Sequence, residues 1–339
     1  MAKKLLALIL SVLMVVTVFA GCGAKNESSS AAGGNGSGKD VNIAIVFGLG
    51  GLGDKSFNDN ANEGANKAKD EFGINYQYVE PKEIAEFEGH HRDFAKEAKY
   101  DLIIGIGFDQ ADAINTVAAE FPEQKFLLID GEAAEAPNVA SVTFKDNEKA
   151  YLIGIIAGMT TETNKIGMVG GMDIPLINAF AAGYKAGATS VNKDIEVMIK
   201  YVGAWNDANT AKELALSMYD AGADIVYQTA GGSGLGVFSA AADKDKLAIG
   251  ADVNQIPLDP AHIFLSSVRR VDNVVYNEIK AVIDGSFEAG TFVQGFKEGA
   301  VSYTTEGAEK ETSKEAIEAA DKAKQDIIDG KIEVPSTLD

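Results

Sequence analysis

Short apolar runs alternate with helix-like segments along the chain from position 41 onward. The runs are rich in β-branched residues and lie at 41–47, 101–107, 125–130, 165–170, 196–202, 225–230 and 247–253. Strands as uniformly apolar as these are buried on both faces, which is typical of parallel sheets covered by helices. The pattern therefore predicts repeated strand–helix units and an α/β fold.

The segments between these runs carry apolar residues at helical spacing. Ala61, Ala65 and Ala68 fall on one stripe, and similar stripes run through 84–98 and 211–218. Strand–helix units repeated in this way predict a doubly wound architecture. A break near 145–150 divides them into two comparable sets, so we expect two lobes, each built on a parallel sheet.

The N-terminus has the pattern of a secretory signal. Lys3 and Lys4 precede an apolar run at 5–18, and small residues lead to Cys22, the only cysteine. This pattern predicts a lipoprotein signal peptide at 1–21, with a lipid attached to the Cys22 thiol. The Gly/Ser-rich stretch that follows is typical of a flexible tether, expected at 22–40. The alternatives are an ordinary signal peptide with an incidental cysteine, or an uncleaved membrane anchor.

Charge and cysteine content narrow the classes of partner. The signal indicates a function on the extracytoplasmic face of the cell membrane, with Cys22 as the anchor. A net charge of −20 makes nucleic acid and anionic lipid headgroups poor partners. With its one cysteine assigned, the chain has no disulfide framework and no thiolate metal site. The C-terminal stretch at 313–331 is predicted to be helical, and the sequence indicates no function for it.

Ligand crevices of open parallel sheets lie beyond the carboxyl ends of the strands. The first such end carries GLGGLGDKSFN, which begins at Gly48. Gly48, Gly50 and Gly53 match a GxGxxG dinucleotide fingerprint, although DKSFN delays the following helix. An exported dinucleotide-dependent oxidoreductase is therefore one alternative. In the other, the glycines let the backbone approach a ligand, while Phe57 and Asn58 offer a flat apolar face and an amide at the lip.

Other strand ends carry further candidates. A second glycine-rich turn, which includes Gly232, leads to Phe238 in the other lobe, and Trp205 ends another strand. Asp252 lies at the end of the strand-like run at 247–253, where a carboxylate can accept hydrogen bonds from two neighbouring sugar hydroxyls. Arg269 either pairs in a hinge or points a guanidinium into the cleft. Each has a structural alternative: a helix cap for Asp252, and close helix–sheet packing for the glycines.

Two aspartates follow the run at 101–107. Asp109 is predicted to cap the helix that begins there. Asp112 lies one turn further in, where its side chain can reach either solvent or the cleft.

The residues do not combine into catalytic machinery. His91 falls on an apolar helical stripe while His90 faces away, so the two adjacent rings are poorly placed to share a metal. Ser56 has no evident base, and the motifs of hydrolase elbows and phosphate-binding loops are missing from the sequence. We therefore expect a binding protein that is not an enzyme and carries no metal or cofactor.

Five motifs occur in the order of a known family. They are GDKSFN at 53–58, KAYLIG at 149–154, GGSGLGVF at 231–238, IGAD at 249–252 and SVRRVD at 267–272. Together they look like the basic membrane protein (BMP) family of substrate-binding lipoproteins, which contains purine nucleoside receptors of ABC transporters. The resemblance implies a type I periplasmic-binding-protein fold, with two doubly wound parallel-sheet α/β lobes joined by a hinge. The lobes are then expected at 41–147 with about 256–285, and at 148–255 with about 286–339.

The same resemblance implies a nucleoside in the cleft between the lobes. Its base would stack on Phe57 from one lobe and on an aromatic ring from the other. Phe238 is the first choice for the second ring, with Phe180 and Trp205 as alternatives.

Polar positions of the family also map onto this chain. Asn58 and Asp112 match positions that face the base, Gly232 lies in the second glycine-rich lip, and Asp252 matches the ribose-binding carboxylate. Arg269 stands where many members have Lys, near the ribose, and its longer planar head can change that contact.

One departure from the family bears on specificity. Purine-binding members commonly carry Asp nine residues before the Phe of Ser-Phe-Asn, where this chain has Gly48, and their Asp pair is reduced to Gly53 and Asp54. A purine is favoured by the resemblance, but the missing carboxylate leaves the preferred base open.

The function expected from these features is capture and delivery. A lipid-anchored protein would bind a nucleoside between its lobes and pass it to an ABC permease served by a separate ATPase. The alternatives are a surface receptor that senses another small molecule, and the exported oxidoreductase.

Overall fold

The computed structural model describes residues 40–338. The predicted signal peptide, Cys22 and nearly all of the predicted tether lie outside the described residues.

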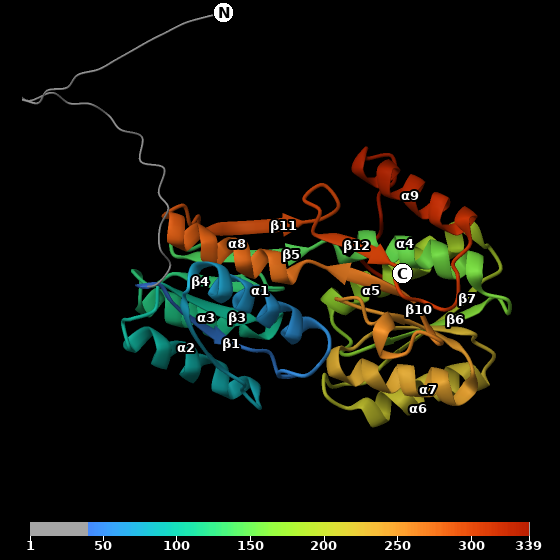
Figure 1. Cartoon of the computed structure of the whole chain (residues 1–339), viewed down its shortest axis with the longest axis horizontal. Helices are drawn as coiled ribbons and strands as arrows, with labels where there is room; N and C mark the ends of the chain where they lie inside the picture. The colour runs from blue at the N-terminus through green and yellow to red at the C-terminus, as the bar shows by residue number, and fades with distance from the viewer. Residues whose placement is uncertain (1–39, 339) are drawn as a thin grey trace, which may run out of the picture. The chain divides into compact units, whose positions relative to one another are not determined.

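Two six-stranded sheets form the frame of the described chain (Figure 1). The first has the strand order β11-β5-β4-β3-β1-β2 and parallel pairing throughout. The second has the order β12-β10-β9-β8-β6-β7, with β12 antiparallel to β10 and the other pairs parallel. The strands of the first are β1 (Asn42–Val46), β2 (Asn75–Val79), β3 (Leu102–Ile106), β4 (Phe126–Ile129), β5 (Val139–Phe144) and β11 (Gly290–Gln294). Those of the second are β6 (Lys165–Gly170), β7 (Glu196–Tyr201), β8 (Ile225–Thr229), β9 (Leu247–Gly250), β10 (Ile263–Arg269) and β12 (Val301–Thr304).

Helices cover both faces of each sheet, as the apolar strands predict. On the first sheet, α1 and α8 cover one face and α2 and α3 cover the other. On the second sheet, α4 and α5 cover one face and α6 and α7 cover the other. The helices are α1 (Phe57–Phe72), α2 (Phe87–Lys96), α3 (Ala111–Glu120), α4 (Asp146–Thr160), α5 (Pro175–Val191), α6 (Ala208–Asp220), α7 (Leu235–Lys244), α8 (Val271–Asp284) and α9 (Lys314–Ile328). Short 3₁₀ turns are η2 (Ile84–Glu86), η3 (Phe108–Gln110), η4 (Gly231–Gly234) and η5 (Ile256–Leu258). The prediction of a doubly wound α/β fold is confirmed.

The predicted helical stripes are largely confirmed. Ala61, Ala65 and Ala68 are fully buried on α1, and His91 is buried on α2. Ile84, which the sequence places on the α2 stripe, is instead 60% exposed, because it lies in a separate 3₁₀ turn before that helix. The C-terminal stretch forms α9, whose cap residue Ser313 accepts a hydrogen bond from the Ala316 backbone N–H at 3.2 Å.

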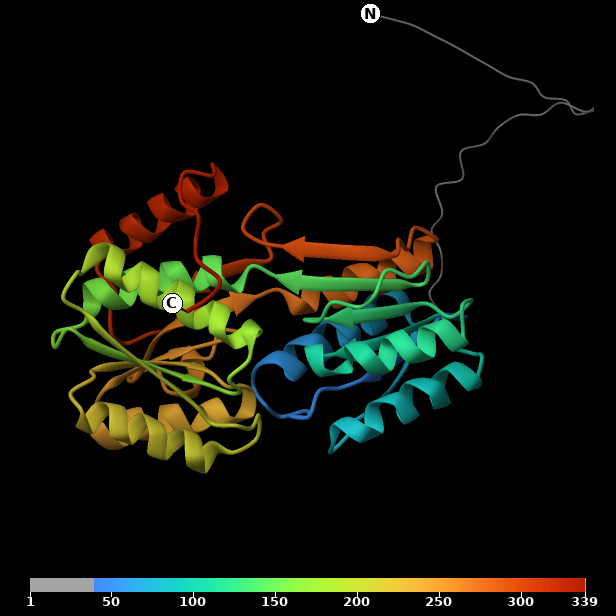
Figure 2. The same cartoon turned by 180° about the vertical axis from the view of Figure 1, so that it is seen from behind.

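The chain crosses between the two lobes three times: after β5, after β10, and between β11 and β12. Figure 2 shows β11 beside β5, although the two strands lie far apart in the sequence. The lobe boundaries differ from those expected from the sequence, which placed 256–285 in the first lobe and 286–339 in the second. In the structure, 263–269 belongs to the second sheet and 290–294 to the first. The strand β11 alternates between exposed and half-buried positions, so it lacks the uniform apolar run that marks central strands such as β3 and β4.

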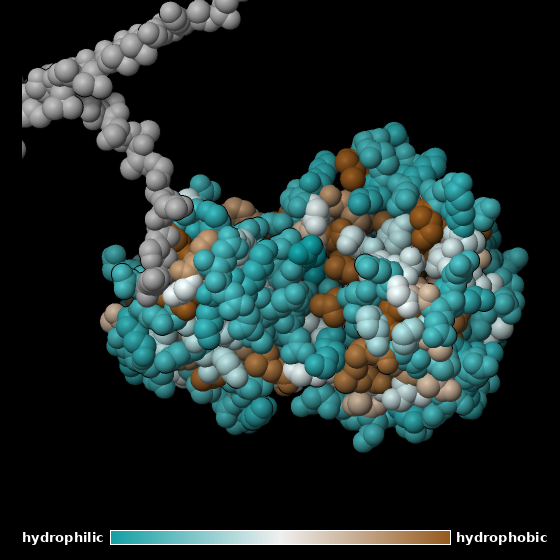
Figure 3. All heavy atoms as spheres, in the orientation of Figure 1, coloured by the Kyte–Doolittle hydropathy of each residue, from teal (hydrophilic) through white to brown (hydrophobic). Residues whose placement is uncertain are grey.

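The surface of the described residues is mostly polar. Figure 3 shows hydrophilic side chains over most of the visible face, with apolar residues in small groups. The exposed large hydrophobic residues come from separate elements, among them Tyr78, Leu258 and Val293. Within 40–338, no helix is long and apolar enough to span a bilayer.

Candidate ligand-binding site

A cavity lies where the carboxyl ends of the strands of both lobes meet. The first lobe contributes the loop that begins at Gly48, the turn after β3, and Asp130 after β4. The second contributes α5, the loops after β7, β8 and β9, and Arg269 at the end of β10. The position agrees with the general rule for open parallel sheets.

Most of the residues predicted from the sequence line this cavity, and two do not. The lining includes Phe57, Asn58, Phe180, Trp205, Gly232, Asp252 and Arg269. Asp112 is the second residue of α3 and is exposed, so it does not line the cavity. Phe238 is 6% exposed and packs in the core beneath α6 and α7. The 3₁₀ turn η4 delays the start of α7, which turns Phe238 toward the sheet instead of the cleft.

Asp54 organises the loop between β1 and α1. Its carboxylate accepts hydrogen bonds from the backbone N–H groups of Ser56, Asn58 and Asp59 at 2.9, 2.8 and 3.1 Å. Burial raises the pKa of Asp54, and these N–H donors oppose the rise. The start of α1 is therefore already occupied by a carboxylate of the chain. A dinucleotide pyrophosphate would meet negative charge there, which argues against the GxGxxG interpretation.

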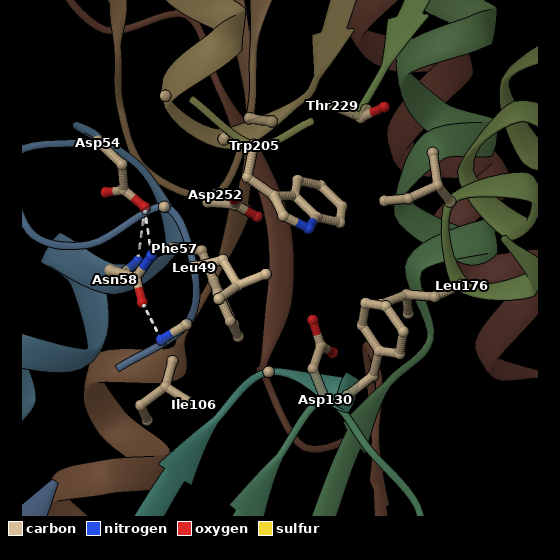
Figure 4. Close-up of a pocket in the computed structure, with 18 of the residues that line it drawn as sticks. Leu49, Asp54, Phe57, Asn58, Ile106, Asp130, Leu176, Trp205, Thr229 and Asp252 are labelled. Atoms are coloured by element: carbon tan, nitrogen blue, oxygen red, sulfur yellow. Dashed lines mark hydrogen bonds between the residues drawn. The ribbon is translucent and has the colours of Figure 1, made fainter. Parts of the chain in front are cut away.

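Asn58 fixes the other side of the same loop. Its Nδ2 donates to Asp54, while its Oδ1 accepts from the Gly48 backbone N–H at 2.9 Å (Figure 4). A Cβ atom on Gly48 would lie 2.9 Å from the carbonyl oxygen of Ile106. A side chain at position 48 would thus require the loop to move. The Asp that many family members carry at this position is therefore incompatible with the loop geometry seen here.

Three aromatic side chains line the cavity. Phe57 begins α1, Phe180 lies on α5 of the other lobe, and Trp205 follows β7. The indole of Trp205 packs on Gly171, where a Cβ atom would come within 2.2 Å of the ring. The guanidinium carbon of Arg269 lies 4.9 Å from the centroid of the Phe57 ring and 5.7 Å from that of Phe180. Flat apolar faces from both lobes therefore border the same space.

Arg269 is the centre of a buried charge cluster. Its Nε donates to Oδ1 of Asp252 at 2.7 Å, and its Nη1 donates to Oδ2 of Asp130 at 2.6 Å and to Oδ2 of Asp146 at 3.3 Å. The Lys149 ammonium lies 2.7 Å from the other oxygen of Asp146. Three carboxylates thus share two cations inside the protein, and each charge depends on the others for compensation.

The aspartates of this cluster differ in their acid–base properties. Burial tends to raise the pKa of Asp252, but Arg269 and Lys149 outweigh it and hold that pKa below its usual value. For Asp130, burial outweighs Arg269 and raises the pKa to about 6. The hydroxyl of Ser56, for which the sequence shows no base, donates to Oδ2 of Asp252. A carboxylate with a lowered pKa is a weak base, so this pair is poorly suited to activate a nucleophile.

Sequence reasoning missed several residues that line the cavity. Asp109 lies in η3 and faces the cavity, and it makes no capping bond to α3, contrary to the prediction. Burial raises the pKa of Asp109 to about 6. Asp130 is the last residue of the run at 125–130 and directly follows β4, so the rule that singled out Asp252 also marks this residue.

The buried histidine has a structural role. His91 Nε2 lies 2.7 Å from the amide oxygen of Gln110, and burial lowers the His91 pKa to about 4. Among the residues that the structure describes, no group of three His, Cys, Asp or Glu side chains is placed to hold a metal ion.

Two parallel-sheet lobes with a cavity at their strand ends define a type I periplasmic solute-binding fold. An ABC transporter solute-binding protein from Aeropyrum pernix K1 shares it, with a TM-score of 0.82 and 31% sequence identity, covering 88% of this chain and 94% of that one. Residues 41–337 match the Bmp family, described as ABC transporter substrate-binding protein PnrA-like. The chain belongs to this family, which confirms the resemblance that the five motifs indicate.

Two relatives show how far the similarity extends. The ABC transporter nucleoside-binding protein BmpA of Lactococcus lactis subsp. cremoris is 38% identical, over 99% of this chain and 100% of the relative. An uncharacterized lipoprotein of Pyrococcus abyssi is 36% identical, over 89% of this chain and 77% of the relative.

Proposed function

We propose that this ABC transporter substrate-binding protein binds a nucleoside, with a purine favoured, in the cavity between its lobes. The observation that carries the proposal is that aromatic side chains from both lobes and a buried carboxylate line the same cavity. Phe57, Phe180 and Trp205 border the space, and Asp252 lies among them. Stacking suits a flat base, and a carboxylate suits the hydroxyls of a ribose. The name of the lactococcal relative supports the same ligand class.

Contacts between the lobes support a mechanism of closure around the ligand. Ser56 of the first lobe donates to Asp252 of the second, and the side-chain amide of Gln255 donates to the Lys55 carbonyl at 2.8 Å. These contacts close one side of the cavity. Rotation of the lobes about the three crossing segments would open and close them. Burial of the ligand's apolar faces would contribute several kcal/mol at about 25 cal/mol per Å².

Delivery completes the proposed role. The protein would stand on the extracytoplasmic face of the cell membrane, attached through lipidated Cys22, and pass its ligand unaltered to an ABC permease with a separate ATPase. The signal pattern before Cys22 and the lipoprotein relative support the anchor. Release without chemistry agrees with the weakly basic Asp252 beside Ser56.

Isothermal titration calorimetry with a nucleoside panel tests the proposal. The purified protein is first stripped of co-purified ligand by unfolding and refolding, and is then titrated with purine and pyrimidine ribonucleosides. We expect saturable heat with micromolar or tighter affinity for at least one, and weaker binding after Asp252→Ala. A protein that refolds to its native melting profile and gives no heat with any nucleoside contradicts this ligand class and leaves the fold unaffected.

A further inference from the structure

Two aspartates occupy matching places in the two lobes. Asp130 follows β4 and Asp252 follows β9, and these strands hold equivalent positions in the two sheet orders. Both residues have the left-handed backbone, with φ of 69° and 70°, which Asp adopts more readily than most residues. Both also bind Arg269, from opposite lobes. The cavity is therefore bordered by a pair of carboxylates on either side of a single guanidinium.

The two carboxylates differ in how their oxygens are used. Asp252 bonds Arg269 through Oδ1 and Ser56 through Oδ2. Asp130 bonds Arg269 through Oδ2 alone, and its Oδ1 has no hydrogen-bond partner among residues 40–338. Asp130 is only 5% exposed and lines the cavity, and Figure 4 shows its carboxylate pointing into that space. A buried acceptor without a donor is costly, so a donor on a ligand would remove the penalty.

We propose that Asp130 binds the ligand directly, with Oδ1 accepting a hydrogen bond from a hydroxyl group of its sugar. This inference rests on the proposed function, because it takes a nucleoside as the ligand. The sugar is the expected partner because Arg269 bonds both Asp130 and Asp252, so the two carboxylates lie beside the same guanidinium. Asp130 would then be a specificity-determining residue that the sequence reasoning did not identify.

Acid–base properties agree with this role. With a pKa of about 6, Asp130 is mostly ionised at neutral pH and acts there as a hydrogen-bond acceptor. An ionised acceptor forms stronger hydrogen bonds than a neutral one. The Asp130 carboxylate therefore discriminates between a ligand that carries the correct hydroxyl and one that lacks it.

The test pairs one substitution with a set of ligands. Wild-type protein and Asp130→Asn are titrated by calorimetry with the best-binding ribonucleoside and its 2′-deoxy, 3′-deoxy and 5′-deoxy derivatives. Asn also tolerates the left-handed backbone. We expect Asp130→Asn to weaken binding of the ribonucleoside about 10-fold or more, as for loss of a bond to a charged group. For one deoxy derivative, the two proteins should bind within about 2-fold of each other, because the partner hydroxyl is already missing.

Asp146→Asn is the matched control. Asp146 contacts the same Nη1 atom of Arg269 but does not line the cavity, so its loss disturbs the cluster without removing a group that faces the ligand. This variant should change binding of all four ligands by one common factor. If Asp130→Asn does the same, Asp130 has only a structural role and the inference is wrong. If wild-type protein binds none of the ribonucleosides, the proposed function fails first, and this inference falls with it.

A crystal structure of the wild-type protein with its nucleoside tests the same point without any substitution. A sugar hydroxyl oxygen within about 3.2 Å of Asp130 Oδ1 supports the inference. An Oδ1 atom that contacts no atom of the bound ligand overturns it, whether or not the variant folds.

Discussion

The Ser56 hydroxyl in the first lobe donates a hydrogen bond to Oδ2 of Asp252 in the second. The bond joins the loop before α1 to the carboxylate after β9, across the cavity that we propose to be the ligand site. It therefore links closure of the lobes to the residue expected to hold the ribose. We expect Ser56→Ala to weaken nucleoside binding about 10-fold or more, as for loss of one hydrogen bond to a charged group.

Calorimetry at fixed pH measures this effect. Ser239→Ala is the control, since that hydroxyl bonds only the Leu235 carbonyl within its own helix. Equal affinities for Ser56→Ala and wild-type protein would show that the bond does not contribute to closure.

Phe57 is expected to supply one stacking face for the base. Base–aromatic stacking contributes about 1–3 kcal/mol per base, so Phe57→Ala should raise the Kd about 5-fold or more. Phe72→Ala is the control. Phe72 is the last residue of α1, at the opposite end from Phe57, and its ring packs on Tyr276 of α8. A similar Kd for the two variants in a calorimetric titration would contradict the stacking role.

Arg269 should matter for stability as well as for the site. The Arg269 guanidinium donates to Asp252 and to Asp130 from two different nitrogens. The single ammonium group of a lysine reproduces this pair of hydrogen bonds poorly. We expect Arg269→Lys to lower the free energy of unfolding by about 1–3 kcal/mol. Arg269→Met should lower it by about 3–5 kcal/mol, because buried carboxylates would lose their partner. Urea unfolding measures both values.

The control for Arg269 is Arg92, whose guanidinium pairs with Glu120 and Glu88 near the surface. Loss of such an exposed pair costs about 0–1 kcal/mol. If Arg92→Met and Arg269→Met destabilise the protein equally, the buried cluster does not stabilise the link between the lobes.

Asp109 should make stability depend on pH. Burial raises its pKa from 3.8 to about 6, so the native state holds this proton more tightly than the unfolded state does. The stability that this proton contributes is complete below pH 3.8 and is lost as the pH rises through 6. Asp109→Asn should therefore be about 1–2 kcal/mol more stable than wild-type protein at pH 7, with a smaller difference at pH 5.

Urea unfolding of ligand-free protein at pH 5, 6 and 7 checks this expectation. Asp112→Asn, which replaces an exposed aspartate three residues further along, is the control. Parallel profiles for wild-type protein and Asp109→Asn would contradict the assignment.

The fold was predictable because its strands are simple. Uniformly apolar runs such as those of β3 and β4 have every side chain buried, and that burial leaves a clear pattern in the sequence. The strand β11 pairs along a single edge and alternates in exposure, so its pattern is weak. For this reason the boundaries between the lobes were predicted less accurately than the architecture.

The site was predictable where a residue lies in the loop after a strand or at the start of the next helix, and less so further into a helix. Phe57, at the start of α1, and Trp205, in the loop after β7, both line the cavity. Phe238 lies four residues into a helix, where its direction depends on the length of the preceding 3₁₀ turn. The strand-end position of Asp130 is visible in the sequence, but its unpartnered oxygen is not, because only the geometry around Arg269 reveals it.

Fluorescence of Trp205 provides the most direct test of nucleoside binding in the inter-lobe cavity. Trp205 is the only tryptophan of the chain and lines that cavity, so its emission reports on this site alone. Titration of ligand-stripped, refolded protein with the nucleoside panel should give a saturable change in emission with at least one member. That change should require higher concentrations in Phe57→Ala. Unchanged emission with every nucleoside, in protein whose melting profile is native, would contradict the account.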